Sequence, residues 1–144
     1  MDRKYSNEIT SKDNGKSVTV AGWVHDIRDL GNLRFLLIRD RTGIIQVTII
    51  KKYVPEKVFK TSGKISKESV VKIEGKIKTE KKAPRGYEII PSMIEVLSYA
   101  ESPLPLDPTG KVSANIDTRL DNRVIDLRRE EIRGIFKIRN AAIE

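Results

Sequence analysis

The sequence predicts an all-β fold: a closed five-stranded barrel with one short helix between the third and fourth strands, followed by an extended hinge and a C-terminal helix. Three observations support this prediction. Segments within residues 1–100 alternate apolar and polar side chains with a period of two, which is typical of half-buried strands. A proline-rich stretch follows at 101–110. Residues 130–144 then carry apolar side chains at helical spacing.

The first three strands form a meander joined by tight turns. They are predicted at about Ser17–Ile27, Leu33–Arg39 and Ile44–Ile50. The last two flank Asp40–Gly43, a glycine-containing turn between alternating runs, which is typical of a β-hairpin. Gly22 within the first strand indicates a bulge or a sharp bend, as a small barrel requires.

The rest of the barrel is predicted in residues 51–100. Apolar residues at helical spacing indicate a short helix within Lys52–Ser66. Strand four is predicted at Ser69–Lys78 and strand five at Tyr87–Leu97, where Pro91 favours an edge or a bulged strand. This order of elements matches the OB-fold, a five-stranded Greek-key barrel that binds oligonucleotides across its second and third strands. SH3-like and other small β-barrels compete with this interpretation.

Alternation sorts the side chains of the barrel into an inner and an outer face. The residues predicted inside are Leu36, Ile38, Ile45, Val47, Val71 and Ile73. Phe35 and Gln46 then stand exposed and adjacent on the outer face. An aromatic ring beside an amide suits an unstacked base, because the ring can stack and the amide can read a base edge. A register slip of one residue would instead bury Phe35 in the core, and Gln46 alone would be an ordinary solvated residue.

The character of the chain changes after residue 100. We expect the barrel domain to span 1–100 and a proline-rich hinge to span 101–129. Within the hinge, Leu120, Val124 and Leu127 lie at helical spacing among arginines. Residues 130–144 read as a helix with acidic residues in its first turn. This helix reaches the last residue without a C-cap signal, so we expect it to be the truncated start of a longer protein.

Composition narrows the classes of function. The chain of 144 residues has a net charge of +8, and all of the excess lies in residues 1–100. That distribution favours a polyanion-binding domain, although a lysine-rich solubilising surface is the alternative. With no cysteine and one histidine, no disulfide and no metal site are expected. The polar N-terminus and the lack of a long apolar run predict neither a signal peptide nor a membrane span, so a cytoplasmic location is expected.

Four motifs resemble one family closely. They are AGWVHDIRDLG (Ala21–Gly31), FLLIRDRTGIIQV (Phe35–Val47), PLPLDPTGKV (Pro103–Val112) and DTRLDNRVIDLRR (Asp117–Arg129). Together they resemble the N-terminal anticodon-binding domain and hinge of archaeal-type aspartyl-tRNA synthetases, which are class II enzymes. The first two motifs occur more loosely in asparaginyl and lysyl relatives, whereas the last two favour the aspartyl branch.

The resemblance implies roles for residues of the outer face. Phe35 matches the ring that stacks on the central uridine of the anticodon, and Gln46 matches the amide that reads the edge of that base. Arg28 matches a further anticodon contact. Glu88 matches a carboxylate near the flanking anticodon bases. Without the resemblance, Arg28 reads as half of a surface ion pair and Glu88 as an exposed strand residue.

Two further positions bear on the choice of tRNA. In the family, enzymes strict for tRNA-Asp tend towards Trp and Lys where this chain has His25 and Pro84. The His and Pro pair resembles the non-discriminating type, which accepts tRNA-Asp and tRNA-Asn; otherwise His25 reads as a solvent-exposed turn residue. A basic group around the loop between strands four and five is expected either to be solvated or to reach phosphates. It comprises Lys78, Lys81, Lys82 and Arg85.

The resemblance ends before the first motif of the family's catalytic domain. No catalytic residue is therefore assigned within 1–144, and we expect this chain alone to be inactive and to bind no cofactor. ATP and Mg are implied for a full-length aspartate–tRNA ligase, which is expected to form a homodimer through the missing domain. The alternatives are a free-standing OB-fold protein for single-stranded nucleic acid, the same domain of an asparaginyl-tRNA synthetase, and a module that docks an acidic protein.

Overall fold

The computed structural model describes residues 2–143, which form two compact units. The first unit ends at Ser102 and the second begins at Pro103. The first unit contains all five strands and the second contains the three C-terminal helices.

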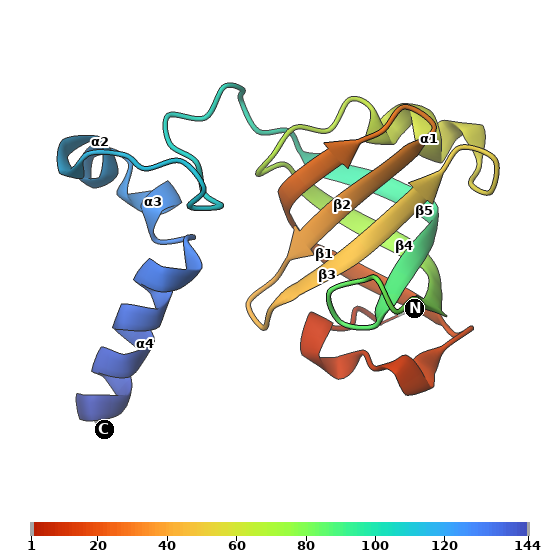
Figure 1. The fold of residues 1–144 in the computed structure, drawn as a ribbon, viewed down its shortest axis with the longest axis horizontal. Helices are drawn as coiled ribbons and strands as arrows, with labels where there is room; N and C mark the ends of the chain where they lie inside the picture. Colours follow the sequence, from red (N-terminus) through yellow and green to blue (C-terminus); the bar gives the residue numbers. More distant parts are fainter. Residues whose placement is uncertain (1, 144) are drawn as a thin grey trace. The chain divides into compact units, whose positions relative to one another are not determined.

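The first unit is a closed barrel of five strands (Figure 1). The strands are β1 (Ser17–Asp29), β2 (Leu33–Arg39), β3 (Ile44–Ile50), β4 (Val70–Thr79) and β5 (Tyr87–Ser98). They follow the order β1-β2-β3-β5-β4 around the barrel, which closes through the pairing of β4 with β1. All neighbouring pairs are antiparallel except β3 with β5. The prediction of an OB-type barrel with one helix between the third and fourth strands is confirmed.

The barrel interior is filled by the apolar side chains that alternation predicts. Leu36 and Ile38 of β2 and Ile45 and Val47 of β3 are at most 2% exposed, as are Val71 and Ile73 of β4. Burial of each such side chain contributes about 1.5–3 kcal/mol to folding. Ile9 also belongs to the core, although it comes from the polar N-terminal segment. The sequence pattern did not indicate this residue.

β1 pairs with both β4 and β2, and Gly22 lies near the point where the strand passes from one partner to the other. Residues Ser17–Trp23 pair with β4, whereas Trp23–Asp29 pair with β2. A Cβ at Gly22 would overlap the carbonyl oxygen of Arg39, so only glycine allows this close approach. The expected bend is therefore present. The bulge lies slightly later, because His25 is the extra residue between the paired positions Val24 and Asp26.

β5 runs without interruption through Pro91. In the ladder with β4, Gly75 is paired with Pro91 and Glu74 with Met93, so Ser92 is an extra residue on β5. The strand is thus bulged, as predicted, and it pairs with a strand on each side rather than lying at an edge. The bulge allows the strand to accommodate a residue that has no N–H to donate.

Short elements cover the two ends of the barrel (Figure 1). Helix α1 (Glu56–Ser62) is shorter than the predicted segment, and it buries Val58. At the other end lie two 3₁₀ helices, η1 (Ser6–Glu8) and η2 (Ser11–Asp13). The N-terminal segment is tied to the barrel because the Tyr87 hydroxyl donates to the carbonyl oxygen of Ile9 at 2.5 Å.

The second unit contains α2 (Ile116–Asp121), α3 (Arg123–Asp126) and α4 (Glu130–Ile143). The helical spacing predicted for Leu120, Val124 and Leu127 within the hinge corresponds to the region of α2 and α3. Before it, residues 103–115 form turns and bends without a helix or strand. The side chain of Asn115 caps α2 by accepting a hydrogen bond from the Thr118 amide. No helix among the described residues is long and apolar enough to cross a membrane.

Candidate nucleic-acid interface

Three neighbouring strands place the predicted base-binding residues on one outer face. In the β1–β2 ladder Arg28 is opposite Phe35, and in the β2–β3 ladder Phe35 is opposite Thr48. Gln46 is opposite Leu37 in the same ladder. Side chains that are directly opposite each other in a ladder point to the same side of the sheet. Arg28, Phe35, Thr48 and Gln46 therefore share the outer face, away from the core residues between them.

Phe35 and Gln46 are half-buried, which corrects the expectation that they are fully exposed. Phe35 does not belong to the apolar core cluster. Its cross-strand neighbours, Arg28 and Thr48, flank the ring on either side, and such neighbours shield part of a side chain even on an outer face. Phe35 thus keeps part of its surface accessible to solvent, as stacking on a base requires.

Gln46 is held by a carboxylate from a strand that is distant in sequence. Parallel pairing of Val47 with Ile89 brings Glu88 of β5 beside β3. The Gln46 amide nitrogen Nε2 lies 3.1 Å from Oε2 of Glu88 and 3.3 Å from the hydroxyl of Thr48. The Thr48 hydroxyl in turn donates to Glu88 at 2.5 Å. Both N–H groups of the amide are thus engaged, and its carbonyl oxygen is the group that can accept a hydrogen bond from a ligand.

Glu88 is buried rather than exposed. The alternative reading of this residue as an ordinary exposed strand residue is therefore wrong. A buried carboxylate needs hydrogen bonds in place of water, and Gln46 and Thr48 supply them. The arrangement fixes the orientation of the amide, since Glu88 accepts and cannot donate to the amide oxygen when ionised.

His25 is aimed by a buried ion pair. The guanidinium of Arg39 makes two hydrogen bonds to Glu68, at 2.9 and 2.8 Å, and both side chains are buried. One nitrogen of this guanidinium, Nη1, also lies 3.0 Å from Nδ1 of His25. Arginine has donors only, so Nδ1 accepts in this contact. The bulge in β1 thus holds His25 against a buried ion pair.

Pro84 and the basic residues lie in or beside the loop between β4 and β5. Pro84, Lys81 and Lys82 are exposed. The two residues predicted to affect the choice of tRNA are on different elements, because Pro84 is in this loop and His25 is on β1. Arg85 donates to the carbonyl oxygen of Ser6 at 2.7 Å, so this residue anchors the loop to the N-terminal segment.

Lys78 is the basic residue paired with a member of the interface. It is exposed on β4, directly opposite Glu88 in the β4–β5 ladder. Its side chain therefore lies on the same side of the sheet as Glu88, which holds Gln46. Among the described residues, no group of three or more His, Asp or Glu side chains could hold a metal ion.

Thr48, Arg39 and Glu68 are parts of the site that sequence reasoning did not select. Thr48 had a usable signal, because it lies two residues after Gln46 and so on the same face of the strand. Arg39 and Glu68 are 29 positions apart, and nothing local indicates that they pair. Glu68 also adopts a left-handed backbone conformation, with φ of 66°, in the turn before β4.

The barrel topology and the polar, partly aromatic outer face define an OB-type nucleic-acid-binding domain. Residues 18–97 match the model of the tRNA anti-codon family, described as an OB-fold nucleic acid binding domain. The chain belongs to this family, and the motif-based assignment to it is confirmed.

The chain is similar to archaeal aspartate–tRNA ligases of two kinds. It is 55% identical over 136 residues to the aspartate–tRNA(Asp/Asn) ligase of Methanopyrus kandleri, covering 94% of this chain and 32% of the relative. It is also 55% identical over 137 residues to the aspartate–tRNA(Asp) ligase of Pyrococcus abyssi, covering 95% of this chain and 31% of the relative. The chain thus spans about a third of the length of the curated relatives it matches.

Solved structures agree with the fold. The asparaginyl-tRNA synthetase of Pyrococcus horikoshii, complexed with asparaginyl-adenylate, matches with a TM-score of 0.88 and 31% identity, over 99% of this chain and 32% of that chain. The aspartyl tRNA synthetase of Entamoeba histolytica matches with a TM-score of 0.88 and 28% identity, over 97% of this chain and 35% of that chain. Both matches include the C-terminal helices as well as the barrel.

Proposed function

We propose that this chain is the tRNA anticodon-loop-binding part of an aspartate–tRNA ligase that accepts both tRNA-Asp and tRNA-Asn. The observation that carries the proposal is the common outer face of Arg28, Phe35 and Gln46 on a barrel of the anticodon-binding family. Similarity to aspartate–tRNA ligases at 55% identity supports the choice of amino acid. The excess positive charge on residues 1–100 favours a polyanion over an acidic protein as partner.

The hydrogen bonds of Gln46 suit a uridine at the central anticodon position. Uracil has an N3–H donor on its Watson–Crick edge, whereas cytosine has an acceptor at N3. Because Glu88 and Thr48 engage the amide nitrogen, the carbonyl oxygen of Gln46 is oriented to accept from N3–H. Phe35 supplies the stacking surface beside it. Arg28, opposite Phe35, supplies a cation for a neighbouring phosphate or base.

The third anticodon base, C in tRNA-Asp and U in tRNA-Asn, distinguishes the two substrates. The bases differ at position 4, where cytosine has an amino donor and uracil a carbonyl acceptor, and at N3, where cytosine accepts and uracil donates. Strong discrimination would require a group that the wrong base leaves unpaired. Pro84 offers neither a backbone N–H nor a polar side chain. His25 is smaller than the Trp of the strict enzymes and leaves more room for either base.

Further proposals concern the whole protein. We propose that residues 1–100 form the anticodon-binding domain, 101–129 a hinge and 130–144 the start of a helix leading to a catalytic domain. ATP-dependent aminoacylation, with ATP and Mg, would take place in that domain, which would also form the homodimer. We propose a cytoplasmic location for the enzyme.

The asparaginyl alternative has one observation in its favour, namely the structural match to an asparaginyl-tRNA synthetase. The identity of that match is 31%, against 55% for the aspartate–tRNA ligases. A free-standing nucleic-acid-binding protein is less supported, because the relatives match beyond the barrel into the C-terminal unit. We therefore retain the aspartyl assignment.

The test is a titration of this chain with anticodon stem-loops that carry GUC, GUU or GAC. GUC and GUU should bind within about tenfold of each other, or about 1.4 kcal/mol, and GAC should bind more weakly. Phe35→Ala should cost about 1–3 kcal/mol, the value of one stacked base. Gln46→Ala should reduce the preference for GUC over GAC. Phe136→Ala, which removes an exposed ring in α4, is the matched control.

Two outcomes would contradict the proposal separately. If Phe35→Ala and Gln46→Ala bind all three stem-loops like the parent chain, the outer face is not the binding surface. If GUC binds more than about tenfold tighter than GUU, the chain discriminates and the proposed roles of His25 and Pro84 are wrong. In that case the anticodon-binding role itself would stand.

A further inference from the structure

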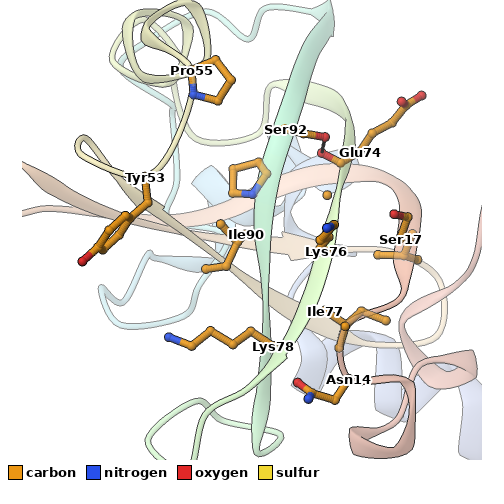
Figure 2. Close-up of a pocket in the computed structure, with 14 residues that line it drawn as sticks. Asn14, Ser17, Tyr53, Pro55, Glu74, Lys76, Ile77, Lys78, Ile90 and Ser92 are labelled. Carbon is orange, nitrogen blue, oxygen red and sulfur yellow. Dashed lines mark hydrogen bonds between the residues drawn. The ribbon is translucent and has the colours of Figure 1, made fainter.

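A recess of about 740 Å³ lies on the barrel beside β4 and β5 (Figure 2). Ile90 and Pro91 of β5 form part of its apolar surface. Tyr53, in the turn after β3, forms one wall, and Lys76 and Lys78 of β4 lie on its other side. Its volume falls within the range of about 300–1,000 Å³ typical of ligand pockets. The proposed anticodon contacts Arg28, Phe35 and Gln46 are not among the residues that line it.

Strand geometry makes this recess continuous with the proposed binding face. Along β5, Glu88 and Ile90 are two residues apart, so they project to the same side of the strand. In the β4–β5 ladder Lys78 is opposite Glu88 and Lys76 is opposite Ile90. Glu88 is also hydrogen-bonded to Gln46. A ligand bound at Gln46 therefore reaches the recess by moving one pleat along β5.

The groups around the recess suit a nucleotide. Figure 2 shows that the ring of Tyr53 and the amine of Lys78 project to the same side of β5, with Ile90 between them. The Tyr53 side chain is 69% exposed, so its ring is available for stacking. Both lysines are exposed, which suits contacts to phosphates.

The acidic member of the lining does not change this assignment. Glu74 is on β4, two residues before Lys76, and its carboxylate is 3.8 Å from the amine of Lys72. Lys76 and Lys78 outnumber this one carboxylate in the lining, so the local balance is positive. An aromatic ring, an apolar floor and cations form the combination that binds single-stranded nucleic acid.

We infer that the recess is a second RNA subsite, which takes one unstacked nucleotide next to the anticodon bases. The base packs against Tyr53 and Ile90, and Lys78, with Lys76, contacts the adjoining phosphate. This inference rests on the proposed function, because the anticodon on the outer face delivers the neighbouring nucleotide. The alternative occupant, an acidic segment of a protein, is an outcome of the test.

The test uses short RNAs and the full chain. The trinucleotide GUC and its two tetranucleotide forms, extended by one adenosine at the 5′ or the 3′ end, are titrated and followed by NMR. One of the two extended RNAs should bind at least about fivefold more tightly than GUC. This factor corresponds to the lower limit of the free energy gained by stacking one base. Tyr53→Ala should abolish that gain without weakening GUC, and Lys78→Ala should reduce the gain. Tyr99→Ala and Lys64→Ala, which change exposed residues of another surface, are the matched controls.

The outcomes separate this inference from the proposed function. Phe35→Ala should weaken all three RNAs and leave the gain from the extension intact. If GUC binding depends on Phe35 but neither extension tightens it, or the gain persists in Tyr53→Ala, the second subsite is refuted and the anticodon face stands. The recess is a protein-docking site instead if two results occur together. The RNA extension gives no gain in affinity, and a glutamate-rich peptide binds the parent chain but not the double variant Lys76→Ala with Lys78→Ala.

Discussion

The barrel and the C-terminal unit differ in what fills their interiors. In the barrel the large side chains with least exposure are mostly apolar, such as Val24, Leu36 and Ile73, each at 0%. In the second unit the corresponding residue is a carboxylate, Asp126, which is also 0% exposed. Three arginines surround it. Arg119 lies 3.0 Å from one oxygen, Arg123 lies 2.9 Å from the other, and Arg129 lies at 3.6 Å.

This difference indicates that the two units are stabilised by different forces. Apolar side chains carry no charge, so their burial in the barrel does not depend directly on ionisation. Charge pairs whose arginines are partly exposed are screened by salt and depend on ionisation. In α4, none of the described residues is buried, and Ile138 is 73% exposed. We therefore expect perturbations to act on one unit at a time.

The largest expected effect is on the barrel, from Gly75→Ala. A Cβ at this position would overlap the backbone carbonyl oxygen of Ile90, and backbone cannot move aside as a flexible side chain can. We expect a loss of about 1–3 kcal/mol or more in the free energy of unfolding. Urea denaturation followed by the fluorescence of Trp23, the one tryptophan, measures it. Lys76→Ala, at the next position, which is exposed, is the control. If Gly75→Ala has the same urea midpoint of unfolding as this control, the β4–β5 ladder has shifted to make room for the added Cβ.

A smaller effect, confined to the second unit, is expected from Asp126→Asn. Hydrogen bonding from Arg119 is the main cause that holds the pKa of this carboxyl below its ordinary value of 3.8. The folded state therefore favours the ionised form, and its stabilisation is complete above about pH 4 and lost as pH falls through the folded pKa. Asp126→Asn should lower the helical ellipticity at 222 nm at neutral pH and remove most of its acid dependence. Asp121→Asn, on the same unit, should do neither.

The Trp23 signal decides whether this effect is local. Trp23 lies in β1, so its fluorescence reports the barrel while the ellipticity reports mainly the helices. Asp126→Asn should leave the Trp23 transition unchanged. A parallel loss of barrel stability would mean that the two interiors are not energetically separate.

The sequence predicts the parts of this molecule that depend on local pattern. Alternation along a single strand identifies interior residues such as Leu36 and Val47, because side-chain direction follows from position alone. It cannot identify Ile9, which lies among polar residues and enters the core only because the N-terminal segment folds across one end of the barrel.

The candidate site shows the same limit. Phe35 and Gln46 follow from alternation, but the contact between Gln46 and Glu88 joins residues 42 positions apart. It depends on β5 inserting between β3 and β4, which is a property of the whole barrel. The Arg39–Glu68 pair that orients His25 likewise depends on a bulge and a turn that no local pattern specifies.

The smallest expected effect is a gain, from Gly134→Ala in α4. The glycine lies inside the helix, and a Cβ there would meet nothing within 4 Å. Alanine is favoured over glycine inside a helix by about 0.8–1.0 kcal/mol, because it loses less backbone entropy on folding. Helices of this length are marginal in water unless tertiary packing holds them. Since α4 buries none of its described residues, propensity should limit its population, and the variant should raise the ellipticity at 222 nm. The Trp23 transition should not move.

Two results for Gly134→Ala would contradict this expectation. An unchanged ellipticity would show that α4 is already fully formed. A rise in both the ellipticity and the Trp23 transition would show that α4 and the barrel fold as one cooperative unit, so that the two units would not be stabilised separately.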